Sequence, residues 1–245
     1  MKLTIFGGST AAGLGVKDGS FGALVADRLG LEFENLAGSS AQITDSIEIV
    51  DKAAGSSVVL VMHGSGEALI RPTERLLRFM PPRWRRRGWM DPRAYYSRNR
   101  RKRIGQRIES AIRWRVKVTL IRLTGGEHLI DIDTYSKTTE RFIARLHELG
   151  VPVIAFVGSA AMDPRYFPYS AQIIEEYDRR TRELAENNGA IFIDVLDVCR
   201  RWDDYFGDHL HPRESGHRRL ADAIIARLDT EGLASDEPAR RISAL

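Results

Sequence analysis

The sequence predicts an α/β fold in which helices cover both faces of a five-stranded parallel sheet. Short apolar segments alternate along the chain with segments of helical periodicity, and this order is typical of parallel sheets. The strand candidates are apolar almost throughout, as expected for strands that are buried on both faces. With 245 residues, the chain fits a single domain, 1–245, that carries one substantial insertion.

Five segments rich in β-branched and apolar residues are the strand candidates: residues 2–6, 31–36, 57–62, 151–157 and 190–195. Five segments with apolar residues at helical spacing are the helix candidates: residues 22–29, 43–54, 134–149, 171–188 and 214–228. Gly30, Gly150 and Gly189 follow three of these helices, and glycine often follows a helix end. The polar tail after Asp229 is expected to fray.

The alternation is interrupted between the third and fourth strand candidates by a segment far longer than one crossover helix requires. Within it, residues 71–80 and 100–123 have helical patterns. Residues 71–122 contain 18 Lys/Arg and 3 Asp/Glu, a net charge of +15, whereas the rest of the chain carries −11. The sequence therefore predicts a basic helical insertion, 71–122, in an acidic body. A basic charge confined to one segment favours a local surface that faces an anionic group.

Composition excludes several classes of protein. No apolar run approaches the ~18 residues that a membrane helix needs. The first residues read as a strand rather than as a signal peptide, and the single Cys199 cannot form an internal disulfide. We therefore expect a cytoplasmic protein. The chain has no Cys/His cluster with zinc spacing, no phosphate-binding loop and no dinucleotide fingerprint, so we expect no metal and no cofactor.

Three loops follow strand candidates at what should be one edge of the sheet. The first strand leads into Gly7-Gly8-Ser9-Thr10, and open α/β sheets bind ligands at the carboxyl ends of their strands. A serine in this place is equally typical of a helix N-cap. Residues 35–40 and 63–67 form glycine-containing loops whose backbone N–H groups could face an oxyanion, although each also reads as an ordinary turn.

The loop before the last helix contains Asp208 and His211, three residues apart. A carboxylate at that spacing can accept a hydrogen bond from one ring nitrogen, which leaves the other nitrogen to take the proton of Ser9. Taken alone, the Asp-x-x-His pattern also fits a metal ligand pair or a surface. We expect His63 to satisfy a hydrogen bond in the core, and His209 and His217 to be partly exposed.

Four segments, in this order, resemble the motif blocks of the SGNH/GDSL hydrolase superfamily: IFGGSTAAGLG, NLAGSS, HGSGEAL and GDHLHPRESGHRRLADAI. The resemblance covers residues 1–66 and 134–228 and implies a flavodoxin-like three-layer α/β/α sandwich. It implies that Ser9 is the nucleophile, His211 the base and Asp208 the partner that orients the base. It also implies an oxyanion hole formed by the backbone N–H groups of Ser9 and Gly38, with position 66 as the third part.

Two positions depart from the family pattern. Gly8 stands where the family usually has Asp, at a position that tolerates variation. Gly66 stands where the family has an Asn whose side chain donates to the oxyanion, and Glu67 replaces the Asp that follows. Losing one such donor can cost roughly 3 kcal/mol of barrier. Ser65, a water or a donor from the insertion could replace it, or the alignment could shift by one or two residues.

Trp84, Trp89 and Trp114 lie within the basic segment. The preferred interpretation of this segment is a lid whose arginines hold an anionic group, such as a sugar acid or the phosphates of an acyl carrier. The second is a solvated hairpin that pairs with the acidic body. Adhesion to an anionic membrane surface follows, and nucleic acid has the least support. The insertion is also loosely similar to those of actinobacterial SGNH proteins that acylate sugar acids inside the cell.

The sequence as a whole predicts serine-dependent acyl transfer through an acyl-serine intermediate. The partner is a small polar ester or acyl donor, sugar-like or anionic, and the acceptor is water in an esterase or an alcohol in an acyltransferase. The alternative is a catalytically weak SGNH-fold binding protein that docks on a membrane or a partner through its basic insertion. The missing Asn supports this alternative, whereas the intact Ser9, Asp208 and His211 oppose it.

Overall fold

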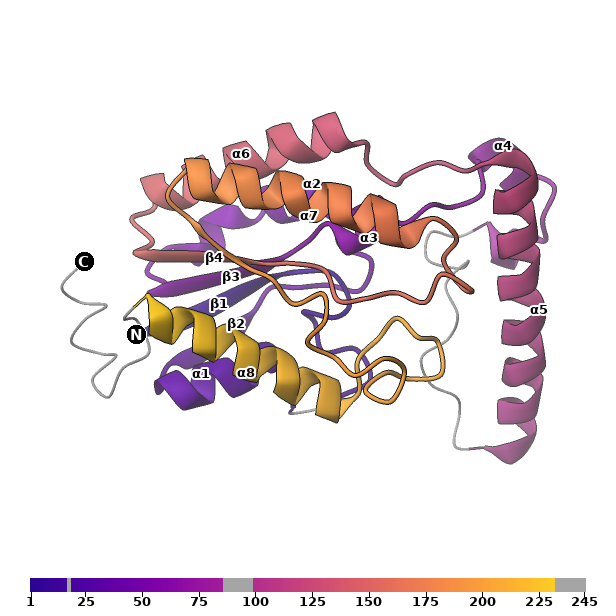
Figure 1. Ribbon diagram of the computed structural model, residues 1–245, viewed down its shortest axis with the longest axis horizontal. Helices are drawn as coiled ribbons and strands as arrows, with labels where there is room; N and C mark the ends of the chain where they lie inside the picture. Colours follow the sequence, from indigo (N-terminus) through magenta and orange to yellow (C-terminus); the bar gives the residue numbers. More distant parts are fainter. Residues whose placement is uncertain (17–18, 86–98, 232–245) are drawn as a thin grey trace.

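The computed structural model describes residues 1–16, 19–85 and 99–231. Its centre is a sheet of five parallel strands in the order β2-β1-β3-β4-β5 (Figure 1). The strands are β1 (Lys2–Gly7), β2 (Glu32–Asn35), β3 (Val58–Met62), β4 (Val153–Val157) and β5 (Ile191–Ile193). From β1 the chain first adds β2 on one side and then β3, β4 and β5 on the other. The strand order therefore reverses between β1 and β3, and open α/β sheets bind ligands at such a point.

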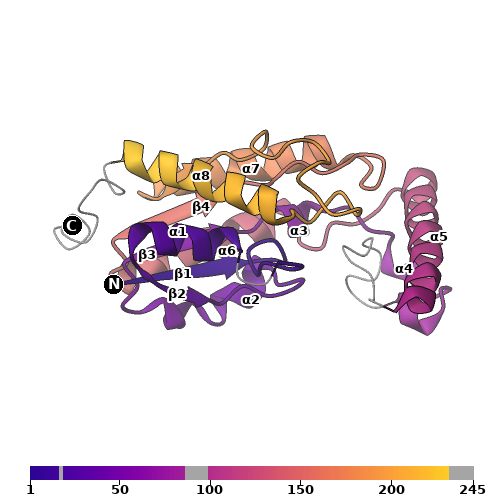
Figure 2. The same ribbon diagram turned by 90° about the horizontal axis from the view of Figure 1, so that it is seen from below.

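Helices cover both faces of this sheet (Figure 2), which confirms the predicted three-layer α/β/α fold. One face carries α1 (Phe21–Leu29) and α8 (Glu214–Thr230), and the other carries α2 (Ile43–Ile47), α6 (Ile132–Glu148) and α7 (Ser170–Asn187). Shorter helices, all in the connections, are η1 (Val50–Ala53), α3 (Ser65–Ala68), α4 (Glu74–Leu77) and η2 (Pro82–Trp84).

Alternation along the strands divides the core into two layers. Ile5 of β1 is fully buried among α1 and α8, whereas Phe6 points to the other face and meets Phe142 of α6 edge to face at 5.1 Å. Burying one such side chain stabilises the fold by about 1.5–3 kcal/mol. Among the residues that the structure describes, none of the helices is long and apolar enough to cross a membrane.

Three elements differ from their sequence predictions. β2 is half exposed because it is the edge strand, and its sequence alternates two glutamates with Phe33. The predicted helix 43–54 breaks into α2 and a 3₁₀ turn, and five of its twelve residues are β-branched, which lowers helix propensity. The predicted helix 71–80 has a single turn, because Pro72 cannot donate a helical hydrogen bond and Arg71 instead pairs with Glu127 as an antiparallel bridge.

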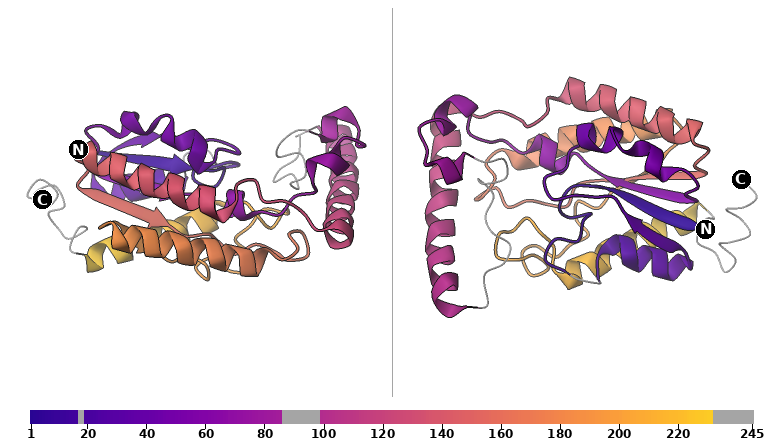
Figure 3. Two further views of the ribbon diagram at one scale, coloured as in Figure 1. Left: turned by 90° about the horizontal axis from the view of Figure 1, so that it is seen from above. Right: turned by 180° about the vertical axis from the view of Figure 1, so that it is seen from behind.

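The described part of the basic insertion lies at the end of the sheet to which the strands point. Its long helix, α5 (Arg100–Thr124), lies beyond the carboxyl ends of the strands in every view (Figure 3). Two aromatic contacts join this helix to the body. The Trp114 ring lies 4.8 Å from the Tyr166 ring, and Lys117 Nζ lies 4.1 Å above the Phe167 ring. Trp89 and the tail from 232 onward lie outside the described residues.

Candidate active site

A sharp turn at the end of β1 presents Ser9. Gly7 ends the strand with φ 154°, and a Cβ at this position would lie 2.5 Å from the Met62 carbonyl oxygen. Glycine is therefore required for β1 to leave the sheet so close to β3. The Gly8 N–H then donates to the same Met62 carbonyl (3.3 Å), and the Ser9 carbonyl accepts from Leu14 N–H (3.0 Å). These bonds fix the turn and leave the Ser9 hydroxyl at the edge of the sheet.

The loop that precedes α8 presents His211. Asp208 Oδ1 accepts hydrogen bonds from the backbone N–H groups of Leu210 (3.0 Å) and His211 (3.1 Å), which folds the loop around this carboxylate. The Phe206 N–H donates to the His211 carbonyl (2.9 Å) and closes the turn. Asp208 is fully buried, and His211 is 6% exposed. One carboxylate thus shapes the loop and faces the imidazole that the loop carries.

Ser9, His211 and Asp208 form one chain of hydrogen bonds. The Ser9 hydroxyl lies 2.8 Å from His211 Nε2, and His211 Nδ1 lies 2.7 Å from Asp208 Oδ2. Because Nδ1–H donates to the carboxylate, Nε2 is left as the acceptor for the Ser9 proton. The structure therefore brings the N-terminal hydroxyl and the C-terminal imidazole together in the arrangement that activates a serine for nucleophilic attack.

His209 connects the loop that precedes α8 to the loop after β4. Its Nδ1 lies 2.6 Å from Asp163 Oδ2, and its ring stacks on Trp202 with the centroids 4.8 Å apart. Burial raises the pKa of Asp163, but hydrogen bonds from Arg165 and His209 outweigh this effect and hold that pKa below its usual value. His209 is a non-glycine residue with positive φ (52°), so this packing maintains a strained backbone beside His211.

The three positions expected to form an oxyanion hole differ in what they offer. No residue within the described ranges accepts a hydrogen bond from Ser9 N–H, so this group can face a ligand. The Gly38 N–H instead donates to the Gly7 carbonyl (3.1 Å), and in this structure it is used within the protein. Gly66 lines the pocket beside Ser9 but has no side chain to donate.

Glu67 is a structural residue below the pocket. Its carboxylate accepts from Ile43 N–H (2.8 Å) and Gly64 N–H (2.9 Å) and lies 3.0 Å from His63 Nδ1. Burial raises the pKa of Glu67, but the neighbouring His63 and the two backbone donors outweigh burial and hold it below its usual value. His63 Nε2 also lies 2.8 Å from Ser46 Oγ, which confirms that this imidazole satisfies a core hydrogen bond.

His217 differs from its sequence prediction, because it is fully buried rather than partly exposed. Its Nδ1 accepts a hydrogen bond from Phe21 N–H (3.2 Å), and its ring stacks on that of Phe21 with the centroids 5.9 Å apart. The residue therefore joins α8 to the first turn of α1.

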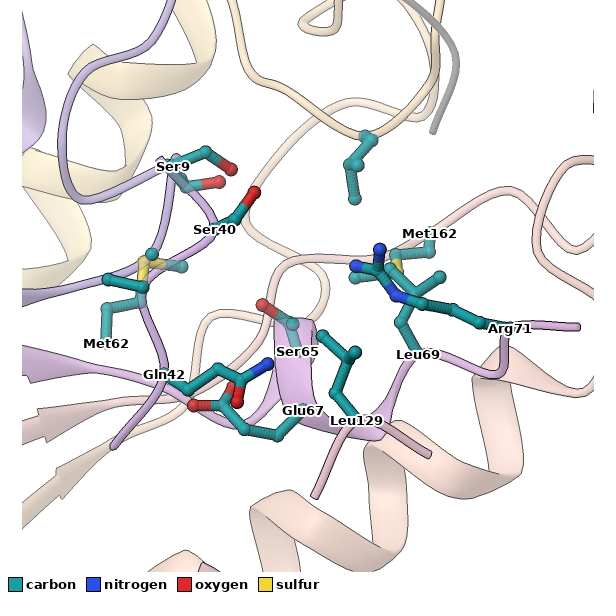
Figure 4. Close-up of a pocket in the computed structure, with 15 residues that line it drawn as sticks. Ser9, Ser40, Gln42, Met62, Ser65, Glu67, Leu69, Arg71, Leu129 and Met162 are labelled. Atoms are coloured by element: carbon teal, nitrogen blue, oxygen red, sulfur yellow. The ribbon is translucent and has the colours of Figure 1, made fainter. Parts of the chain in front are cut away.

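A pocket opens in front of Ser9 (Figure 4). Arg71, from the start of the insertion, lies on the wall opposite Ser9, with Ser65 and Gln42 lower in the pocket. Much of the remaining wall is apolar: Met62, Leu69, Leu129, Met162 and Leu210. Sequence reasoning did not find Gln42, Leu129 or Met162, because each lies in a segment without a recognisable motif.

A chain of hydrogen bonds runs from the half-buried Ser9 through His211 to the buried Asp208 at the carboxyl edge of an α/β/α sandwich, and this is the arrangement expected of a serine-dependent hydrolase. The chain belongs to the GDSL-like Lipase/Acylhydrolase family, whose sequence model matches residues 5–219. The resemblance to the SGNH/GDSL superfamily is thereby confirmed, and the protein is an esterase-type hydrolase.

Solved structures share this fold over nearly the whole chain. LAE5, an alpha/beta hydrolase from the metagenome of Lake Arreo, is 17% identical, with 93% of this chain and 94% of that chain covered at a TM-score of 0.61. TesA is 14% identical, with 94% and 99% covered, at 0.60. A catalytic mutant of the acetylxylan esterase Axe2 from Geobacillus stearothermophilus is 17% identical, with 93% of each chain covered, at 0.59. No curated protein matches the chain.

Proposed function

We propose that the protein cleaves or transfers an ester acyl group through an acyl-serine intermediate on Ser9. The observation that carries this proposal is the unbroken chain from Ser9 Oγ to His211 Nε2 (2.8 Å) and from His211 Nδ1 to Asp208 (2.7 Å). Asp208 fixes the imidazole in the tautomer whose free nitrogen can remove the serine proton. These side chains supply both kinds of chemistry that the reaction needs, nucleophilic attack by Ser9 and general acid–base catalysis by His211.

In the first step, Ser9 Oγ forms a bond to the ester carbonyl carbon while its proton passes to His211 Nε2. The tetrahedral intermediate then expels the alcohol, which takes that proton, and the acyl group stays on Ser9. In the second step, His211 removes a proton from water or from another alcohol, and the resulting attack releases the acyl group and restores Ser9. The same three side chains thus serve hydrolysis and transfer.

The pocket favours a small polar ester. Its apolar wall suits a short acyl chain, while Arg71 lies opposite the nucleophile and can hold an anionic group of the substrate, as the proposed role of the insertion requires. A cytoplasmic substrate is part of this proposal and agrees with the lone Cys199, which is buried and not in a disulfide.

The test compares the protein with Ser9→Ala on activated esters of two to twelve carbons. We expect turnover that falls by roughly 10³-fold or more in the variant, because the nucleophile is gone while the pocket remains. Covalent labelling of the intact protein by a fluorophosphonate, followed by mass spectrometry, should modify Ser9 alone. Equal traces of turnover in both proteins would contradict the proposal and favour the alternative of an SGNH-fold binding protein.

A further inference from the structure

We propose that the side-chain amide of Gln42 donates a hydrogen bond to the oxyanion and so replaces the Asn that the family carries at position 66. This inference rests on the proposed acyl transfer at Ser9. The tetrahedral intermediate places a negative charge on the former carbonyl oxygen, and a positioned N–H donor stabilises that charge more than it stabilises the neutral ester.

Gln42 has an amide nitrogen without an acceptor. The residue is 3% exposed, and no described residue accepts a hydrogen bond from its Nε2. A buried donor that lacks a partner is unfavourable, so such groups often serve a ligand. Gln42 lines the pocket together with Ser9, and its amide nitrogen points toward Ser65, inside the pocket (Figure 4).

The surroundings of Gln42 explain why its donor stays available. The nearby carboxylate of Glu67 receives the backbone N–H groups of Ile43 and Gly64 and lies against His63. Each of its two oxygens therefore already accepts at least one hydrogen bond. The Gln42 backbone is fixed as well, since its N–H donates to Asp45 Oδ2 (2.9 Å) at the start of α2. The side chain thus extends from a positioned helix end rather than from a free loop.

Gly66 contributes no side chain to the pocket. A Cβ built at this position would meet no atom within 4 Å, so a side chain could begin there without a clash. Ser9, Gly66 and Gln42 line the same pocket. A substrate carbonyl oxygen held there by Ser9 N–H would bring the acceptor that Gln42 lacks, and the two donors together would form the oxyanion hole.

The first experiment measures kcat and KM for Gln42→Ala and for Gln42→Glu on a short activated ester. We expect kcat to fall by roughly 10²- to 10³-fold with little change in KM, because the lost bond forms mainly in the transition state. Gln42→Glu keeps the size of the side chain and replaces the donor with a negatively charged acceptor, whereas Gln42→Ala removes the donor without adding charge, so a loss shared by both variants reports the donor. Gln172→Ala, the same truncation at an exposed position of α7, should leave kcat unchanged.

The second experiment restores the family's donor. The Cβ of Gly66→Asn would meet no atom within 4 Å, and we expect this substitution to raise kcat of Gln42→Ala by at least about tenfold while raising that of the unmodified protein much less. A boronic acid, which forms an anionic tetrahedral adduct on serine, should bind Gln42→Ala more weakly and regain affinity in the double variant. A merely structural role for Gln42 would not produce this rescue.

The outcomes separate this inference from the proposed function. Turnover that depends on Ser9 but changes less than threefold in both Gln42 variants would overturn the inference and leave the proposed function standing. A loss in Ser65→Ala instead of the Gln42 variants would assign the donor to Ser65 and also overturn it. A protein without any Ser9-dependent turnover would refute both.

Discussion

At the residue scale, Asp208 has two separate tasks, one for each carboxylate oxygen. Oδ1 accepts the backbone N–H groups of Leu210 and His211, whereas Oδ2 faces His211 Nδ1 at 2.7 Å. The first task is structural and requires only an acceptor. The second fixes the tautomer of the imidazole and requires a group that cannot donate back to it. These tasks can be separated by one substitution.

We therefore expect Asp208→Asn to lower kcat by roughly 10³- to 10⁴-fold with only a small change in melting temperature. The amide oxygen can still accept the two backbone N–H groups, but its NH₂ group would face His211 and favour the wrong tautomer. Asp203→Asn, at an exposed position five residues earlier, is the matched control and should retain full activity. A melting temperature that collapses together with kcat would contradict the division of tasks.

Residues of the site differ in how far the sequence reveals them. Ser9, Asp208 and His211 lie in segments with recognisable spacing beside strand or helix ends, so their meeting could be predicted. Gln42 could not, because a glutamine before a short helix has no pattern that marks it as a donor. The hydrogen bond from Gly38 N–H to the Gly7 carbonyl also depends on the three-dimensional path of two loops.

At the scale of elements, strands and long helices followed the apolar periodicity of the sequence to within one or two residues, because burial against the sheet decides them. The exceptions depended on context. β2 is an edge strand with exposed glutamates, and the helix predicted over 43–54, which is rich in β-branched residues, breaks into α2 and a 3₁₀ turn. Periodicity does not reveal whether a strand lies at an edge or whether a helical pattern rich in β-branched residues forms one helix or two short turns.

The junction between α1 and α8 makes stability depend on pH through His217. Burial and, less strongly, the neighbouring His211 lower the pKa of His217 to about 4 from 6.5. Between these values the unfolded chain binds a proton that the folded protein does not bind. The free energy of unfolding therefore falls as the pH decreases from about 6.5 to 4, by up to about 3 kcal/mol from this residue.

We expect His217→Asn to reduce this loss, since its amide oxygen can accept the Phe21 N–H without titrating. Urea unfolding at pH 7 and pH 4.5 measures the effect, and the difference between the two values should be smaller in the variant. His147→Asn, at an exposed site on α6, controls for the removal of a histidine. If the free energy of unfolding fell equally with pH in all three proteins, His217 would not be the cause of the pH dependence.

At the scale of the whole molecule, the basic insertion lies near the candidate active site. Residues 71–122 carry +15, and α5 stands beyond the carboxyl ends of the strands (Figure 1), where β1 leads into Ser9. Composition predicted this separation of charge, but not which basic residue reaches the pocket. The bridge between Arg71 and Glu127 joins the start of the insertion to the segment that follows it, and Arg71 lies on the pocket wall.

Arg71→Gln should therefore weaken the binding of anionic esters specifically. A charge-assisted hydrogen bond contributes about 1.5–3 kcal/mol, so we expect KM to rise roughly 10- to 100-fold for an ester with a terminal carboxylate. A suitable pair is 4-nitrophenyl hemisuccinate, which carries the carboxylate, and 4-nitrophenyl butyrate, which is neutral. The KM for the neutral ester should change little. A second pair, with the carboxylate on the alcohol, shows which part of the substrate faces Arg71.

Arg75→Gln removes the same charge from an exposed site on α4 and separates a local contact from the general field of the insertion. If both variants raise KM equally, and 0.5 M salt abolishes the difference between charged and neutral esters, the insertion acts only through long-range attraction. If Arg71→Gln alone changes KM and the effect persists in salt, the arginine binds the substrate directly. Equal KM values for both esters in all proteins would contradict an anionic substrate, and the basic segment would then serve a surface outside the pocket.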